Sequence, residues 1–98
     1  PSFRKRMTIE RKVDEILTIK VKGSIYVFNV DTIIKTVQER DTSLKRVIID
    51  FSEVSTVDAT ACDRLGKLKK SLQTSDNTLD FTNVSEKTAK RIYSFQSL

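Results

Sequence analysis

The feature that most constrains the fold is a repeated switch in hydrophobic period along the chain. Residues 17–22 alternate strictly, with Leu17, Ile19 and Val21 on one side and polar residues on the other. This period of two predicts a half-buried strand near a sheet edge. Gly23-Ser24 is typical of a turn, and residues 25–28 are β-branched and aromatic, which predicts a second short strand.

Helical spacing begins at Val30, where apolar residues recur every three or four positions up to Val37, and Asp31 is the expected N-cap. The helix should end near Arg40 or Asp41. A short apolar run, Val47 to Ile49, then predicts a central strand covered on both faces, as in a parallel sheet.

The second half of the chain repeats the alternation of strand and helix. Residues 55–58 are the expected loop before a helix with Ala61, Leu65, Leu68 and Leu72 on its inner face and Arg64, Lys67, Lys69 and Lys70 on its solvent side. Residues 79–84 predict a strand, and Ser85 is the expected cap of a last helix with Ala89, Ile92 and Phe95 facing inward. The predicted order is β-β-α-β-α-β-α, an α/β fold with helices packed on a mixed sheet.

Composition excludes several kinds of chemistry. The 98 residues include no histidine, so Ser-His and Cys-His nucleophilic pairs cannot form. One cysteine, Cys62, allows no internal disulfide and no Cys/His metal site. Two glycines, Gly23 and Gly66, cannot build a phosphate-binding loop of the P-loop or dinucleotide type. We therefore expect no enzyme, no cofactor and no metal.

The net charge of +5 is concentrated at the start of the chain. Residues 1–22 hold seven basic and three acidic residues, an excess of +4, so the body is nearly neutral. Residues 1–12 are interpreted as a basic lead-in and residues 13–98 as the domain. The lead-in fits either phosphate contacts or a position beside anionic lipid, but without a basic stripe on the body specific nucleic-acid binding is not expected. Because the chain begins at Pro1, we interpret it as a segment of something longer.

Three aspartates near the central strand are candidates for an acidic cluster: Asp50, Asp58 and Asp63. The carboxyl ends of strands are where open α/β sheets place their sites. An N-cap at Asp58 is nevertheless favoured over a catalytic or Mg²⁺ role, because the position precedes a predicted helix. Cys62, in the first turns of that helix, is interpreted as a small structural residue.

Two segments resemble a known family. Residues 46–68, RVIIDFSEVSTVDATACDRLGKL, resemble the signature of the STAS domain, which anti-sigma factor antagonists share with the tails of sulfate permease (SulP) family anion transporters. Residues 23–29, GSIYVFN, resemble the element that opens the first helix in the transporter branch. The resemblance covers residues 13–96 and implies the STAS fold.

One position departs from the antagonist branch. In phosphorylation-switched antagonists the residue after the conserved aspartate is the modified serine, whereas Ala59 follows Asp58 here. Thr60 has a hydroxyl and is the candidate phosphoacceptor, although in a shifted position. The missing hydroxyl and the YVFN element both favour the transporter branch.

The resemblance thus implies a cytoplasmic regulatory domain at the membrane face of a SulP-type anion transporter. Its expected partners are the membrane domain of the parent, a regulatory protein or nucleotide, and a second copy in a homodimer. The alternative is a free-standing anti-sigma factor antagonist or stress-signalling protein. The candidate contact residues for a partner or anion are Asn29, Ser55, Thr56, Asp58, Ala59 and Thr60.

Overall fold

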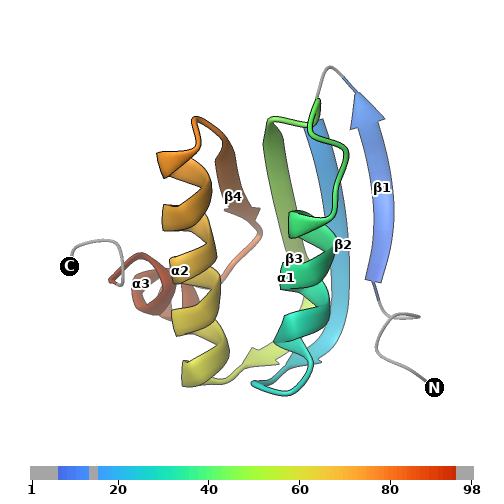
Figure 1. Cartoon of the computed structure of the whole chain (residues 1–98). Helices are drawn as coiled ribbons and strands as arrows, with labels where there is room; N and C mark the ends of the chain where they lie inside the picture. Colours follow the sequence, from blue (N-terminus) through green and yellow to red (C-terminus); the bar gives the residue numbers. More distant parts are fainter. Residues whose placement is uncertain (1–6, 14–15, 95–98) are drawn as a thin grey trace.

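The computed structural model describes residues 7–13 and 16–94, with side chains from residue 16 onward. It contains a four-stranded sheet with helices α1 (Val30–Gln38) and α2 (Ala59–Thr74) on one face (Figure 1). The strands are β1 (Met7–Val13), β2 (Ile16–Ile25), β3 (Arg46–Val57) and β4 (Thr78–Thr82), and α3 (Glu86–Ser94) follows the last strand.

The sheet order is β1-β2-β3-β4, with β1 antiparallel to β2 and the other two pairs parallel. Each parallel connection therefore crosses over through a helix, α1 between β2 and β3 and α2 between β3 and β4. The predicted mixed sheet and the order β-β-α-β-α-β-α are confirmed.

The positions predicted for the first two strands are wrong. The hairpin joins β1 to β2, so residues 7–12 of the predicted lead-in belong to β1, and β2 is not at the sheet edge. Gly23 is no turn: it lies within β2 at φ 84°, where the pairing with β3 shifts register. Glycine tolerates this positive φ, and the extra residue at the shift, Ser55, lies on β3. The strand continues to Ile25, and residues 26–28 lie in the turn before α1.

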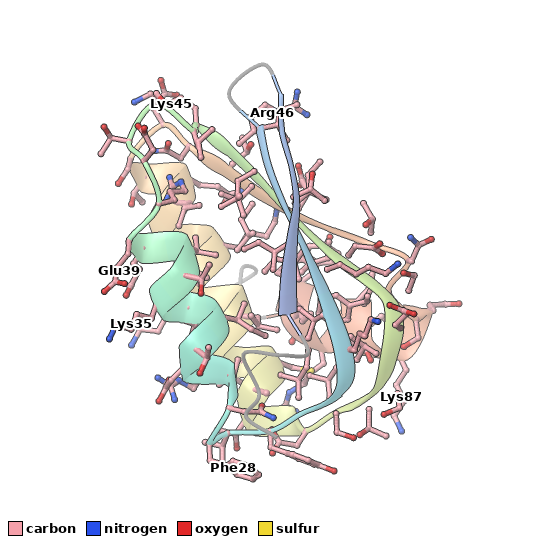
Figure 2. The ribbon with its side chains drawn as sticks, turned by 90° about the vertical axis from the view of Figure 1, so that its right-hand side faces the viewer. Phe28, Lys35, Glu39, Lys45, Arg46 and Lys87 are labelled. Atoms are coloured by element: carbon pink, nitrogen blue, oxygen red, sulfur yellow. The ribbon has the colours of Figure 1, made fainter. Side chains whose placement is uncertain are left out.

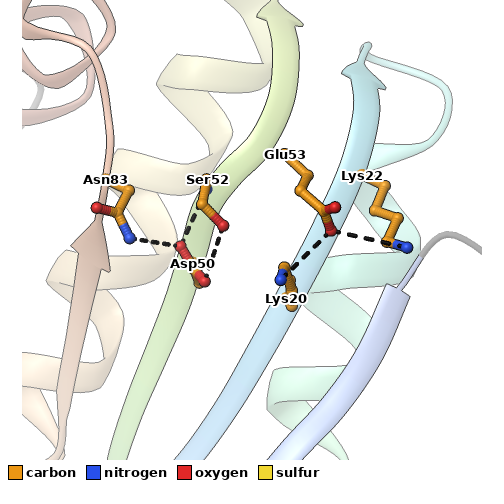
Figure 3. A network of polar contacts seen from close by, with 6 residues as sticks. All are labelled: Lys20, Lys22, Asp50, Ser52, Glu53 and Asn83. Atoms are coloured by element: carbon orange, nitrogen blue, oxygen red, sulfur yellow. Dashed lines mark hydrogen bonds and ion pairs between the residues drawn. The ribbon is translucent and has the colours of Figure 1, made fainter.

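The prediction that the central strand is covered on both faces is also wrong. Val47, Ile49 and Phe51 of β3 are buried beneath the helices, whereas Ile48 and Asp50 on the opposite side are only half-buried. No helix in residues 16–94 covers that opposite face. It carries polar groups, and Figure 3 shows Lys20 and Lys22 of β2 both contacting the Glu53 carboxylate, at 3.4 and 3.7 Å.

The core lies between the helices and the inner face of the sheet. It comprises Leu17, Ile19, Val21, Ile25, Val30, Ile33, Val37, Leu44, Val47, Ile49, Phe51, Ala61, Cys62, Leu65, Leu68, Leu72, Leu79, Phe81 and Ile92. The alternation in β2 and the helical spacing in α1 and α2 thus identified the buried faces. Ile92 of α3 is buried as predicted, Ala89 is partly buried, and Phe95 lies outside the described residues.

Lys69 is a correction to the predicted solvent face of α2. Its side chain is buried because Nζ donates hydrogen bonds to the Leu79 carbonyl at 2.6 Å and to Asp80 Oδ1 at 3.3 Å. The ammonium group also lies 5.6 Å from the ring centroid of Tyr93. The aliphatic part of the Lys69 side chain is thus buried while its ammonium group keeps polar partners. Helical spacing alone does not predict such partners, because they lie on β4.

Candidate functional site

The candidate site lies where β2 and β3 end and α1 and α2 begin, at the lower end of the molecule in Figure 1. Parallel strands bring their carboxyl ends to one edge, so two helix N-termini and two loops meet there. Five of the six predicted site residues lie within β3, at its junction with α2 or in the first turn of α2, and Asn29 precedes α1.

Asp58 connects the start of α2 to the 26–28 turn. Its Oδ1 accepts a hydrogen bond from the Ala61 backbone N–H at 2.8 Å, which confirms the predicted N-cap of α2. Its Oδ2 accepts from the Val27 N–H at 3.2 Å, and its own N–H donates to the Ile25 carbonyl at 3.0 Å. One carboxylate therefore caps α2 and fixes the 26–28 turn against it.

Asn29 occupies the N-cap position of α1, where Asp31 was predicted. The Asn29 side chain makes no bond to the helix. Instead, Oδ1 accepts from the Tyr26 N–H at 2.6 Å and Nδ2 donates to the Ser24 carbonyl at 3.0 Å. Asp31 is the second residue of α1 and forms an ion pair with Arg64 of α2. Asn29 thus shapes the turn, while Asp31 links the two helices.

A cluster of three hydroxyl groups spans the last residues of β2 and β3. Ser24 Oγ lies 3.1 Å from Ser55 Oγ and accepts a hydrogen bond from Thr56 Oγ1 at 3.0 Å. Ser55 and Thr56 were predicted in a loop, but they lie in β3 because pairing with β2 continues to Val57. Ser24 was missed by the sequence analysis, since it was assigned to a turn. The polar residues near the ends of both strands are the one sequence feature that could have indicated a role for Ser24.

The remaining predicted residues face solvent. Ala59 and Thr60 are exposed in the first turn of α2. Beside them, the 26–28 turn presents Tyr26, Val27 and Phe28, of which Phe28 is 77% exposed. The rings of Tyr26 and Phe28 stack at a centroid distance of 5.3 Å. Figure 2 shows Phe28 projecting at this end of the molecule, opposite Lys45 and Arg46.

The three aspartates do not form a cluster. The hydrogen bond from Asn83 holds the pKa of Asp50 below its usual value, and the Asp50 carboxylate also accepts from the Ser52 N–H and hydroxyl (Figure 3). Arg91 lowers the pKa of Asp63 through a two-point contact, with both N···O distances 2.9 Å. Each carboxylate therefore has a different partner. Within the described part of the chain, no three Cys, Asp or Glu residues gather into a group able to hold a metal ion.

Cys62 lies just below this surface. The side chain is 3% exposed, and burial raises the pKa of its thiol. Both observations agree with the interpretation of Cys62 as a packing residue, because the thiolate is the reactive form. Among the helices of residues 16–94, none is both long and apolar enough to cross a lipid bilayer.

Comparison with protein-family models matched residues 8–97 to the STAS domain. Comparison with curated proteins found no match. Among solved structures, the anti-sigma factor antagonist SpoIIAA in its unphosphorylated form is similar with a TM-score of 0.68 and 17% identity, covering 92% of this chain and 81% of that one.

Two longer proteins also contain a similar fold. The structure of SLC26A9 matches with a TM-score of 0.68 and 16% identity over 86% of this chain and 16% of that one. The structure named Mglu matches with a TM-score of 0.71 and 13% identity over 81% of this chain, which spans only 20% of Mglu. At these identities the structural likenesses establish the fold alone.

Proposed function

This chain belongs to the STAS domain family, and we propose that it is the cytoplasmic regulatory domain of a SulP-type anion transporter. The observation that carries the proposal is the exposed aromatic turn at residues 26–28, fixed by Asp58 beside Ala59. This turn contains the YVF of the element that resembles the transporter branch, and position 59 lacks the hydroxyl of phosphorylation-switched antagonists.

The turn has the character of a contact surface. Three consecutive apolar side chains with a stacked aromatic pair are exposed at one end of the domain. Covering the Phe28 side chain would contribute roughly 1.5–3 kcal/mol to association, so a partner gains from contacting it. The proposed contact surface consists of residues 26–28 with Asp58, Ala59 and Thr60, and the membrane domain of the parent or a regulatory protein is its partner. Nucleotide binding and a homodimer stay predictions.

Sulfate uptake by the intact parent protein tests this function. We expect the coding sequence before Pro1 to encode membrane spans, and Phe28→Ser in the full protein to alter radiolabelled sulfate uptake at unchanged membrane abundance. Lys45→Ser is the matched control, because Lys45 is exposed at the opposite end (Figure 2). A parent sequence without membrane spans would refute the transporter assignment. Equal uptake by both variants and the wild type would refute the role of the turn.

An anti-sigma factor antagonist is the second candidate, favoured by the exposure of Thr60 at the start of α2. Phosphate at a helix N-terminus is electrostatically tolerated. An anti-sigma kinase from the same genome, incubated with the chain and labelled ATP, separates the two candidates. Incorporation that is lost in Thr60→Ala supports the antagonist, and no incorporation counts against it.

A further inference from the structure

Over the second half of β3, no described strand pairs with its outer edge. β4 pairs only with residues 46–50 of the 12-residue strand, through Thr78–Thr82. Asn83 then adopts a left-handed φ of 56°, and its amide donates to Asp50 Oδ1 at 2.9 Å. Figure 3 shows this contact where β4 ends and β3 continues. Residues 51–57 therefore pair with β2 on one side and with no described strand on the other.

A groove runs along this edge. A cavity of about 560 Å³ lies between residues 51–57 and the start of α3, and a second of about 540 Å³ continues it along α3. The two cavities share Ser55, Thr56, Val57, Ser85 and Thr88. A strand edge thus faces a helix across an open groove, which is the arrangement that peptide-binding domains use to add a strand.

Two usual protections against strand addition are absent from this edge, because residues 51–57, FSEVSTV, contain neither lysine nor proline. The pairing with β2 shifts register twice along the segment, between Asp50 and Glu53 and between Val54 and Thr56. The one charged side chain in the segment, Glu53, contacts the two lysines of β2 on the sheet face. Val54 and Val57 are half-buried and line the groove together with Val84, so apolar side chains of an added strand have a surface to contact.

The positive charge of the groove favours an acidic occupant. Its charged lining residues are both basic, Lys87 and Arg91 of α3, and Arg91 already binds Asp63 through both nitrogens. Lys87 is exposed at the same end of the molecule as Phe28 (Figure 2). An acidic side chain on the helix-facing side of the added strand would therefore lie near Lys87, next to the N-terminal end of α3, where negative charge is favoured.

We propose that residues 51–57 bind an extended acidic peptide segment of a partner protein, which adds to the sheet as a strand between β3 and α3. Main-chain hydrogen bonds to the strand edge provide the affinity, and Lys87 together with the valine-lined wall provides the selectivity. The groove reaches Ala59, which also belongs to the contact surface around the 26–28 turn, but the strand edge and Lys87 lie outside that surface. The proposal does not depend on the transporter assignment.

The test begins with a random octapeptide library selected on the 98-residue chain. A selected peptide is then synthesised with N-methyl groups on alternate amides, in both phases, and binding is measured by fluorescence anisotropy. Methylation in one phase should weaken binding by about tenfold or more, and methylation in the other phase much less, because only alternate amides face the edge. Equal effects of the two phases would overturn strand addition.

Variants of the chain locate the site. Lys87→Glu should weaken binding of an acidic peptide by roughly fivefold, and Lys70→Glu, an exposed lysine of α2 outside the groove, should not. Thr88→Trp, which fills the groove, should abolish binding while circular dichroism confirms the fold. The proposal is overturned if the library enriches equally on Thr88→Trp, if Lys87→Glu matches Lys70→Glu, or if peptide-induced NMR shifts centre on residues 26–28.

Discussion

Replacement of Asp58 by alanine removes two contacts that no single neighbouring side chain can restore. The first is the N-cap bond to Ala61, whose loss costs about 1 kcal/mol in comparable helices. The second is the bond to the Val27 N–H, and a hydrogen bond to a charged acceptor contributes about 1.5–3 kcal/mol. The 3.2 Å length and the exposed position of this bond place it below that range, at about 1 kcal/mol. We therefore expect Asp58→Ala to lower the free energy of unfolding by about 2 kcal/mol.

Ser85→Ala is the matched control. Ser85 also caps a helix, since its Oγ accepts from the Thr88 N–H at 3.2 Å, but it fixes no distant turn. Its loss should cost about 1 kcal/mol. In a domain of this size 1 kcal/mol corresponds to about 4–8 °C in Tm, so thermal unfolding should show a shift roughly twice as large for Asp58→Ala.

Hydrogen exchange separates the two contacts of Asp58. The Val27 amide should exchange faster in Asp58→Ala than in the wild type under conditions where the core amides are unchanged, and Ser85→Ala should leave it alone. If Asp58→Ala costs no more than Ser85→Ala and the Val27 amide exchanges at its original rate, the carboxylate does not fix the turn. The surface proposed for Phe28 would then lose its structural basis.

Two further substitutions and one measurement of thiol reactivity test the interior and the open sheet face. Lys69→Met keeps the aliphatic stem but loses the bond to the Leu79 carbonyl, and should cost about 1–2 kcal/mol in urea unfolding, whereas the same change at an exposed lysine of α2 should cost little. The lowered pKa of Asp50, held down first by Asn83, means that its carboxylate stabilises the fold above its unfolded pKa. That contribution disappears as pH falls through the folded pKa, so the stability difference between wild type and Asp50→Asn should shrink on acidification below about pH 4. Cys62, buried and with a raised pKa, should react with iodoacetamide far more slowly in the folded chain than in guanidinium, and equal rates would contradict its burial.

The elements predicted correctly are those whose signal is local. Helix α1 follows from the spacing of Val30, Ile33 and Val37, and the start of α2 follows from Asp58, because an N-cap acts only on the next few residues. The inner face of β2 follows from its alternation. Such features depend on residues that are close in sequence, so they can be predicted from one amino-acid sequence.

Two of the elements predicted wrongly depend on pairing with another strand. The second half of β3 is polar, and it is a strand because β2 pairs with it as far as Ile25↔Val57. β1 lies in a basic segment whose strand character comes from its register with β2, beginning at Met7↔Val21. For residues 25–28 the error is the reverse, because a strand was predicted where β2 ends at Ile25 and a turn follows. Their composition suits a strand, but the Asn29 side chain accepts from the Tyr26 N–H and closes a turn.

The departures from local rules lie mostly at one end of the molecule. The positive φ of Gly23, the exposed aromatic turn, the polar continuation of β3 and its unpaired edge all belong to the carboxyl ends of the parallel strands. By contrast, residues 46–49 at the other end of β3 pair on both sides and alternate between buried and more exposed side chains. Stability alone would favour covering Phe28 and pairing residues 51–57, so their exposure is a cost that folding does not explain. We propose that contact with partners offsets this cost, so that both proposed binding surfaces lie at the end where α1, α2 and α3 begin.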